Sequence, residues 1–281
     1  MVPRLESPAF FDAHLEATLA QARRYGRRVA LLVAAGGPAL RRAAPALLDT
    51  LRGSDVVAIE GDELRVLLPE TDRLGALLLH QRILRLVPEA SDLRIGSAAF
   101  PEDVHDAQAL LDLARRRGEA SADALGPAHE LRPLGFEESV RRVIAGTAYA
   151  RTSISHALLR SAKREAILEL ERACTVRGIV AMDGGPVQEG ERLWESLPAS
   201  RLAGRVYVAQ PADRSLPPHP SLTHVPVEEE RFGFVLFLSG HASFAMLRDA
   251  EGRGALSTDL ALVCHLMATF REAHGLREAI A

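Results

Sequence analysis

The residues best suited to chemistry lie in one segment, which runs from Arg52 to Thr71 and reads R-G-S-D-V-V-A-I-E-G-D-E-L-R-V-L-L-P-E-T. Arg52 and Asp55 stand three residues apart, and Asp62 and Glu63 are adjacent. A guanidinium can fork onto a phosphate, whereas a carboxylate can accept hydrogen bonds or hold a divalent cation. These residue types suit contacts with a phosphorylated ligand.

A β-hairpin is predicted to position these residues. Two apolar runs, Val56–Ile59 and Leu64–Leu68, flank the four residues Glu60-Gly61-Asp62-Glu63. Glycine and aspartate tolerate the positive φ that a tight turn requires, so these four residues are predicted to join two antiparallel strands.

The segment resembles the signature hairpin of GGDEF domains, the family of diguanylate cyclases that make cyclic di-GMP from GTP. That family reads R-x-x-D, five residues, G-G-D/E-E-F, and then a strand ending in L-L-P-E-T. The segments R-R-Y-G-R-R-V-A-L-L-V before the hairpin and I-G-S-A-A-F-P-E-D-V-H-D-A-Q-A-L-L after it also resemble the family. One glycine of the turn is missing, and Leu64 replaces the phenylalanine, so the turn of Glu60, Gly61, Asp62, Glu63 and Leu64 is degenerate.

Further departures predict that the protein is not an enzyme. Active members hold divalent cations on a carboxylate at the end of the first strand and on another in the turn, whereas here the strand ends Val33-Ala34-Ala35-Gly36-Gly37. P-A-L-R-R-A-A-P replaces the family's F-K-x-x-N-D and G-H signatures, and Arg115-Arg116-Arg117-Gly118 occupies the place of its lysine. Without that carboxylate, the site lacks a negatively charged ligand that would hold the divalent cations. We expect no catalytic residue, metal or cofactor, and we interpret Asp62 and Glu63 as turn residues.

The pair Arg52 and Asp55 matches the family's inhibitory site, which binds the product cyclic di-GMP. The resemblance therefore implies a cyclic di-GMP site at these two residues, with a further phosphate contact from Arg82 or Arg85 on the next helix. The competing interpretation is an ordinary surface pair, which contributes about 0–1 kcal/mol to stability.

The resemblance also implies a palm-like core, and the hydrophobic pattern agrees with the order β-α-β-β-α-β. We predict a leading helix capped by Ser7, and then the elements of the first domain, residues 1–118. The predicted helices span Pro8–Tyr25, Pro38–Leu51, Asp72–Val87 and Val104–Arg117, and the predicted strands outside the hairpin span Val29–Val33 and Leu93–Phe100.

Residues 119–135 are rich in Ala, Gly, Ser and Pro and are predicted to form a linker. The second domain, 136–281, is predicted to be an α/β domain on a mixed or antiparallel sheet. Its helices are predicted at Phe136–Ala145, Ser153–Arg172, Gly190–Ser196 and Asp259–His274, the last capped by Ser257 or Thr258. Its strands are predicted at Ile179–Met182, Arg205–Ala209, Thr223–Val227, Gly233–Leu238 and Ser243–Leu247, with a loop at Pro211–Pro220.

This half resembles the DICT domain, a sensory module found with diguanylate cyclases and two-component proteins. The resemblance rests on S-I-S-H-A-L-L, R-G-I-V-A-M-D, A-G-R-V-Y-V-A, F-G-F-V-L-F-L and L-S-T-D-L-A-L-V, in that order; a GAF-like sensor has a similar pattern. The Ser-His pairs at Ser155 and Ser239 are not nucleophile elbows, and the histidines show no ligand spacing. Trp194 is expected to anchor its helix on the sheet.

Composition narrows the remaining choices. The net charge is −3, which argues against a nucleic acid or membrane partner. Cys174 and Cys264 lack zinc-ligand spacing, and the chain shows neither a signal peptide nor a run long enough to span a membrane. We therefore expect a cytoplasmic, non-catalytic bacterial signalling protein that binds cyclic di-GMP and regulates an unknown protein partner. The alternative is a ligand-independent adaptor built from two degenerate modules, and exposed helix faces would suit a homodimer.

Overall fold

The computed structural model describes residues 4–123, 131, 133–146, 150–172, 177–185, 202–228 and 231–276. The chain divides into two compact units, Met1–Gly126 and Pro127–Ala281. The α/β class predicted from the sequence is confirmed, because each unit packs helices on a mixed sheet. No described helix is long and apolar enough to cross a membrane.

The first unit is built on a five-stranded sheet in the order β1-β3-β4-β2-β5. The predicted β-α-β-β-α-β succession follows the leading strand and helix, and β2 lies between β4 and β5, antiparallel to both. The strands are β1 (Arg4–Glu6), β2 (Val29–Ala35), β3 (Val56–Glu60), β4 (Glu63–Pro69) and β5 (Arg94–Phe100). The helices are α1 (Pro8–Tyr25), α2 (Pro38–Asp49), α3 (Arg73–Leu86) and α4 (Ala107–Asp123), and a 3-10 turn spans Pro88–Asp92.

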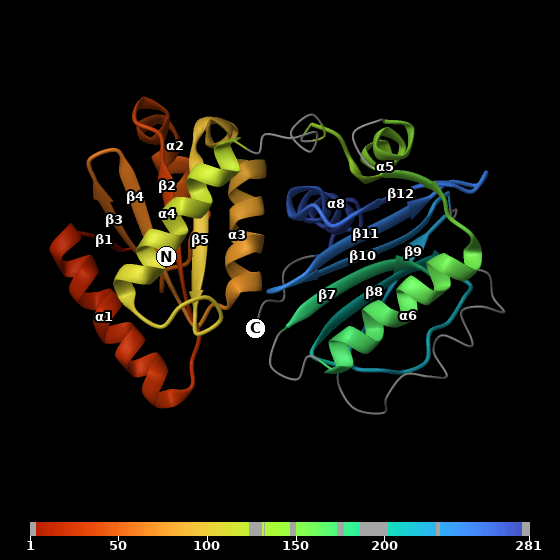
Figure 1. The fold of residues 1–281 in the computed structure, drawn as a ribbon, viewed down its shortest axis with the longest axis horizontal. Helices are drawn as coiled ribbons and strands as arrows, with labels where there is room; N and C mark the ends of the chain where they lie inside the picture. The colour runs from red at the N-terminus through yellow and green to blue at the C-terminus, as the bar shows by residue number, and fades with distance from the viewer. Residues whose placement is uncertain are drawn as a thin grey trace. The chain divides into compact units, whose positions relative to one another are not determined.

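Successive side chains of β2 point to opposite faces of the sheet, and helices cover both faces. Leu32 and Ala34 pack in the apolar cluster that includes residues of α2 and α3, whereas Leu31 and Val33 pack with α1 and α4. Figure 1 shows α1 and α4 on the side of this sheet that faces the viewer. A strand buried on both faces reads as a continuous apolar run, as V-A-L-L-V-A-A does here. The unit thus has three layers, and strand β4 of the hairpin pairs with β2.

The second unit is built on a seven-stranded mixed sheet in the order β6-β12-β11-β10-β7-β8-β9. β7, β8 and β9 run parallel, and the other neighbours are antiparallel. Its strands are β6 (Ala150–Ser153), β7 (Gly178–Asp183), β8 (Gly204–Pro211), β9 (Leu222–Val227), β10 (Gly233–Ser239), β11 (Ser243–Arg248) and β12 (Arg253–Ser257). Its described helices are α5 (Phe136–Ala145), α6 (His156–Arg172) and α8 (Leu260–Ala273).

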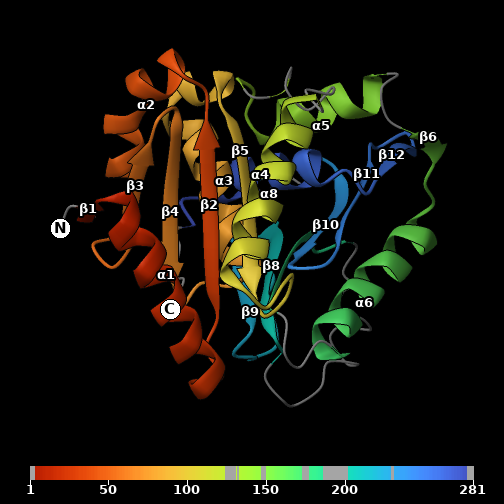
Figure 2. The ribbon, with the colours of Figure 1, turned by 60° about the vertical axis from the view of Figure 1, so that its left-hand side comes forward.

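Helices cover both faces of this sheet as well. Val235 and Phe237 of β10 pack in the cluster that contains the buried side of α6. Phe234, on the opposite face of the same strand, contacts Phe136 of α5 and Phe270 of α8. Figure 2 shows α5 and α6 on opposite sides of the strands.

Several boundaries differ from the prediction. The fourth helix continues from the predicted end at Arg117 to Asp123, into the stretch predicted as a linker. α6 begins at His156, because the preceding residues up to Ser153 form β6. The last helix is capped by Asp259, whose carboxylate accepts from the Ala261 and Leu262 N–H groups, and not by Ser257 or Thr258.

Three short strands were absent from the prediction, namely β1, β6 and β12. The predicted helix Gly190–Ser196, with Trp194, lies outside the described residues, as does Cys174.

Candidate functional site

The turn between β3 and β4 is the predicted tight hairpin. Glu60 pairs with Glu63 across the two strands, so Gly61 and Asp62 form a two-residue loop. Gly61 has φ +60°, which favours glycine in such turns. The Asp62 carboxylate lies 3.1 Å from the Arg41 guanidinium of α2, and both side chains are about two-thirds exposed. The loop therefore carries one acidic group that is paired at the surface.

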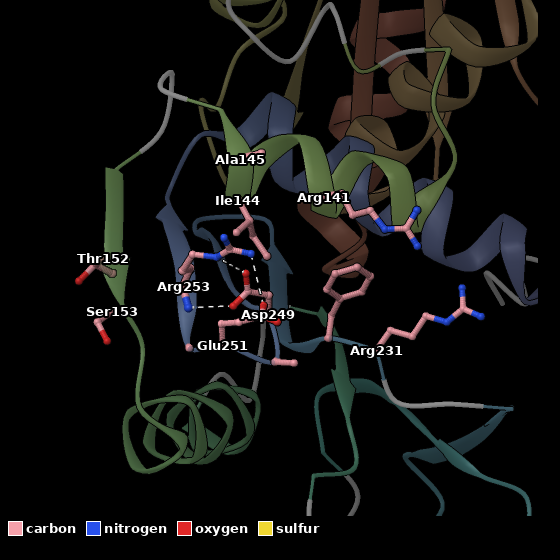
Figure 3. A pocket seen from close by; sticks show the side chains of 13 residues that line it. Arg141, Ile144, Ala145, Thr152, Ser153, Arg231, Asp249, Glu251 and Arg253 are labelled. Carbon is pink, nitrogen blue, oxygen red and sulfur yellow. Dashed lines mark hydrogen bonds and ion pairs between the residues drawn. The ribbon is translucent and has the colours of Figure 1, made fainter.

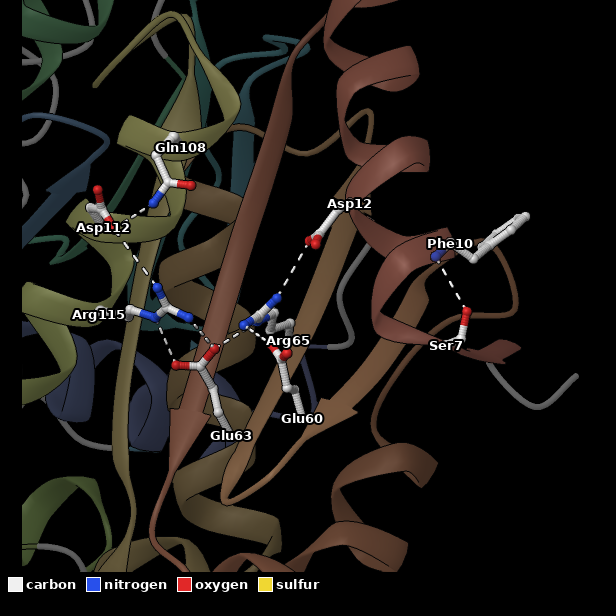
Figure 4. Close-up of polar contacts among 9 residues, drawn as sticks. All are labelled: Ser7, Phe10, Asp12, Glu60, Glu63, Arg65, Gln108, Asp112 and Arg115. Carbon is white, nitrogen blue, oxygen red and sulfur yellow. Dashed lines mark hydrogen bonds and ion pairs between the residues drawn. The ribbon is translucent and has the colours of Figure 1, made fainter.

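Glu63 is bound by two arginines (Figure 4). Arg115 of α4 donates from Nε to Oε2 and from Nη2 to Oε1, each at 2.8 Å, and Arg65 Nε donates to Oε1 at 2.6 Å. Arg65 also donates to Glu60 and, at 3.4 Å, to Asp12 of α1. Burial raises the pKa of Glu63, but the hydrogen bonds and charges of Arg115 and Arg65 outweigh it and hold the pKa below its usual range. Both oxygens of this anionic carboxylate are already engaged by guanidinium groups.

The site that the GGDEF resemblance assigns to divalent cations does not fit a metal. Ala34 and Ala35, at the end of β2, pair with Leu64 and Glu63 of the neighbouring strand β4. Neither alanine offers a carboxylate. Among the residues that the structure describes, no group of three or more His, Cys, Asp or Glu side chains could hold a metal ion. Divalent cations need oxygen ligands, and the carboxylate of Glu63 faces cations instead.

The Arg52–Asp55 motif forms a closed turn after α2. The Asp55 carboxylate accepts from the Arg52 backbone N–H at 2.7 Å, and the Asp55 N–H donates to the Arg52 carbonyl at 3.0 Å. Asp55 is 4% exposed, whereas Arg52 is exposed. Burial raises the pKa of Asp55 above its usual value, against the lowering effects of the Arg52 hydrogen bond and the charges of Arg52 and Arg82. Asp55 therefore stabilises the turn through the Arg52 backbone, which leaves the Arg52 guanidinium outside that contact.

The structure brings Arg82 of α3 to the same turn. Its Nη2 donates to the Thr50 carbonyl at 2.5 Å, and its charge acts on Asp55. The backbone of Arg85 belongs to α3, but its side chain lies outside the described part of the chain. Arg52, Asp55 and Arg82 are thus neighbours, and their role in binding stays a prediction. The bond between Arg82 and the carbonyl of Thr50 joins segments 32 residues apart, and no short sequence motif signals it.

Serine and histidine residues of the second unit have structural partners. Ser155 Oγ accepts from the Leu158 N–H at 3.1 Å in the first turn of α6, and Ser239 Oγ accepts from the Ala242 N–H at 3.0 Å in the β10–β11 turn. Sequence reasoning missed the contact of Ser139 with His265, 2.9 Å between Oγ and Nε2. Ser139 is 0% exposed, so a substrate cannot reach this pair.

Cys264 is equally inaccessible to reagents. The thiol lies on the buried side of α8, and burial raises its pKa to about 12. The thiolate is the reactive form of cysteine, so this side chain is inert near neutral pH.

Comparison with known proteins gives structural neighbours only. No family model matches the chain, and no curated protein matches it. Among solved structures, the GGDEF domain of YfiN (TpbB) from Pseudomonas aeruginosa is 26% identical with a TM-score of 0.34, over 42% of this chain and 91% of that one. A diguanylate cyclase protein from Thermotoga maritima is 18% identical with a TM-score of 0.35, over 39% and 93%.

A third neighbour is the diguanylate cyclase SiaD from Pseudomonas aeruginosa, solved in complex with its activator SiaC. It is 16% identical with a TM-score of 0.35, over 42% of this chain and 56% of that one.

Proposed function

We propose that the protein is a non-catalytic signalling protein whose first unit is a degenerate GGDEF-like domain that binds cyclic di-GMP. The observation that carries the proposal is the turn at Arg52, where Arg82 lies beside the buried Asp55. Two guanidinium groups beside one carboxylate suit a ligand with two phosphates and guanine N–H donors. The position of this turn, directly ahead of the hairpin, and the β-α-β-β-α-β order support the assignment.

In this proposal the same unit does not synthesise cyclic di-GMP. Phosphoryl transfer from GTP needs cations that neutralise the phosphates, but Glu63 is occupied by Arg115 and Arg65, and β2 ends in alanines. We expect no cyclic di-GMP from GTP with Mg²⁺ or Mn²⁺, measured by chromatography of the reaction mixture. Robust conversion of GTP would overturn the proposal.

Binding would act on a partner through a change in conformational equilibrium. A ligand shifts such an equilibrium only by the difference between its affinities for the two states. In this proposal the second unit is a DICT-like sensory or interaction module, and cyclic di-GMP changes its contact with the protein partner. The order of its sequence segments and its helix-covered mixed sheet support that role.

Calorimetric titration of the full chain with cyclic di-GMP tests the binding. We expect micromolar or tighter affinity that is lost in Arg52→Ala, because Arg52 is exposed and makes its bond to Asp55 through the backbone. Arg41→Ala is the matched control, since Arg41 is an exposed arginine of α2 that pairs with Asp62. Equal affinity in all three proteins would place the ligand elsewhere.

The alternative is a ligand-independent adaptor, which one observation favours. Asp55 is buried, and its carboxylate accepts a hydrogen bond within its own turn, as it would if the motif served folding alone. Absence of binding heat in the wild-type protein and in Arg52→Ala would favour this function.

A further inference from the structure

The second unit contains a cleft at the carboxyl ends of its three parallel strands. The cleft has a volume of about 660 Å³. Asp183 ends β7, Ala209 lies near the end of β8, and Val227 ends β9; all three line the cleft. In open α/β sheets, ligands bind outside the carboxyl ends of parallel strands, and this volume is within the usual range of small-molecule sites.

The inner wall of the cleft is aromatic. Phe136 of α5 lies edge-on to Phe234 of β10 and to Phe270 of α8, with ring centroids 5.2 Å apart in both pairs. His274 completes the group at 4.8 Å from Phe270. The three phenylalanines come from three elements and are 7% (Phe136), 4% (Phe234) and 0% (Phe270) exposed. Phe136 and Phe234 therefore give the cleft a small apolar contact surface, which Phe270 supports from behind.

The mouth of the cleft carries both signs of charge. Arg141 Nη2 and Arg231 Nη1 contact the same oxygen of Glu137, at 3.2 and 2.9 Å, and each of the three side chains is about half exposed. The Arg141 guanidinium also lies over the Phe232 ring, 5.8 Å from its centroid. Figure 3 draws a larger neighbouring cleft that shares these two arginines, and it shows their guanidinium groups pointing to the same side. The two arginines therefore converge on one carboxylate at the surface.

Among the described residues that line the cleft, carboxylates are more numerous than cations. Glu137, Glu138 and Glu228 line it with the two arginines, and Asp183 is neutralised by Lys163, 2.6 Å away. Burial lowers the pKa of His274, against the charge of Glu137, which leaves the imidazole neutral near neutral pH. A ligand with one charge would be attracted by one set of groups and repelled by the other. A zwitterionic ligand, which carries one negative and one positive group, is attracted by both the arginines and the glutamates.

A larger neighbouring cleft of about 910 Å³ shares Arg141, Arg231 and Phe232, but its own charges are already paired. Arg253 Nε lies 2.7 Å from Asp249, whose other oxygen accepts from the Arg253 backbone N–H at 2.8 Å. Arg253 also contacts Glu251 at 3.3 Å. Only the smaller cleft combines the aromatic wall with a place at the carboxyl ends of the parallel strands, which makes it the better ligand site.

We propose that the smaller cleft binds a free amino acid with an apolar side chain. The side chain lies against the phenylalanines, the carboxylate replaces Glu137 between Arg141 and Arg231, and the ammonium group pairs with the glutamates. The site would give the second unit a small-molecule signal of its own. It does not depend on cyclic di-GMP binding in the first unit.

Calorimetry of the full chain with matched probes tests this proposal. The probes are L-phenylalanine and L-leucine, with phenethylamine and 3-phenylpropionate as analogues that carry one charge each. We expect an amino acid to bind with a Kd of about 1 mM or tighter, and each single-charge analogue to bind about tenfold more weakly or worse. Arg231→Gln should weaken amino acid binding about tenfold, and Ala273→Trp, at an exposed lining position, should abolish it by filling the cleft.

Arg172→Gln, an exposed arginine at the end of α6, is the matched control and should bind like wild type. Thermal melting of each variant shows that a loss of binding is not a loss of folding. The proposal is overturned if neither amino acid binds, if either single-charge analogue binds as tightly as L-phenylalanine, or if folded Ala273→Trp retains full affinity.

Discussion

Arg115 of α4 binds Glu63 of β4 through two parallel hydrogen bonds, Nε to Oε2 and Nη2 to Oε1, both 2.8 Å long. The contact joins residues 52 positions apart and links α4 to the hairpin of β3 and β4. The Glu63 carboxylate is neutralised in this ion pair, and the pair fixes the hairpin to α4.

A double-mutant cycle measures how much this pair stabilises the protein. Glu63→Gln and Arg115→Gln should each reduce the free energy of urea unfolding, and the coupling between them should be about 1 kcal/mol, because the pair is bidentate but partly exposed. Arg116→Gln, at the exposed neighbouring position, is the control and should have little effect. A coupling near zero would mean that Arg65 alone holds Glu63.

Close packing of α4 on β5 predicts a strong asymmetry between two glycines. A methyl group on Gly96 would overlap the Ala114 carbonyl oxygen and the Gly118 backbone nitrogen, which cannot move without displacing the helix. Gly96→Ala should therefore destabilise the protein by about 3 kcal/mol or more. A methyl group on Gly118 would approach the Gly96 backbone nitrogen only to 3.2 Å, and alanine favours the helix. Gly118→Ala should change stability by less than about 1 kcal/mol, and a loss equal to that of Gly96→Ala in thermal melting would contradict this packing.

Asp103 should make the stability of the protein depend on acid pH. Burial raises the pKa of Asp103, but hydrogen bonds from Arg117 and the Ala99 N–H, with the charge of Arg73, outweigh it and hold the pKa below its usual value. A carboxyl whose pKa is lower in the folded state stabilises the fold above its unfolded pKa, near 3.9, and this stabilisation is lost as pH falls through the folded pKa. Asp103→Asn should cost about 2 kcal/mol at pH 7 because it leaves Arg117 without its carboxylate.

The measurement is denaturant unfolding of the wild type and Asp103→Asn across pH. The difference between the two proteins should be constant from about pH 7 to 5 and shrink below about pH 4. A difference that grew on acidification would show that the pKa of Asp103 is raised in the folded state.

Elements with a strong local signal could be predicted from the sequence. The first helix has the predicted bounds, Pro8–Tyr25, because Ser7 caps its N-terminus, with its Oγ accepting from the Phe10 N–H, and Gly26 takes the left-handed conformation at its end. α5 also matches its prediction at Phe136–Ala145. In both helices apolar residues recur at helical spacing.

Elements that depend on distant partners could not be predicted. β1 has three residues and joins the sheet only through pairing with β3, where Arg4 lies opposite Val56. β6 is also short and pairs with β12 across about a hundred residues of sequence. The binding of Glu63 by Arg115 likewise depends on tertiary placement. The local pattern of apolar and polar residues does not indicate which distant segments pair. A single sequence contains no other information about such pairings.

Lys163, the only lysine among 34 Lys and Arg residues, forms a buried ion pair with Asp183 at 2.6 Å. The Phe234 N–H donates to the other carboxylate oxygen, so this pair joins α6, β7 and β10. Lys163→Met should cost about 3 kcal/mol in urea unfolding, because it leaves Asp183 buried without a cation. Lys163→Met with Asp183→Asn should recover part of that loss, since the amide is neutral and can still accept from Phe234. Arg164→Met, at the exposed neighbouring position, should have little effect. A double variant no more stable than Lys163→Met would show that packing of the lysine chain, and not its charge, is what stabilises the site.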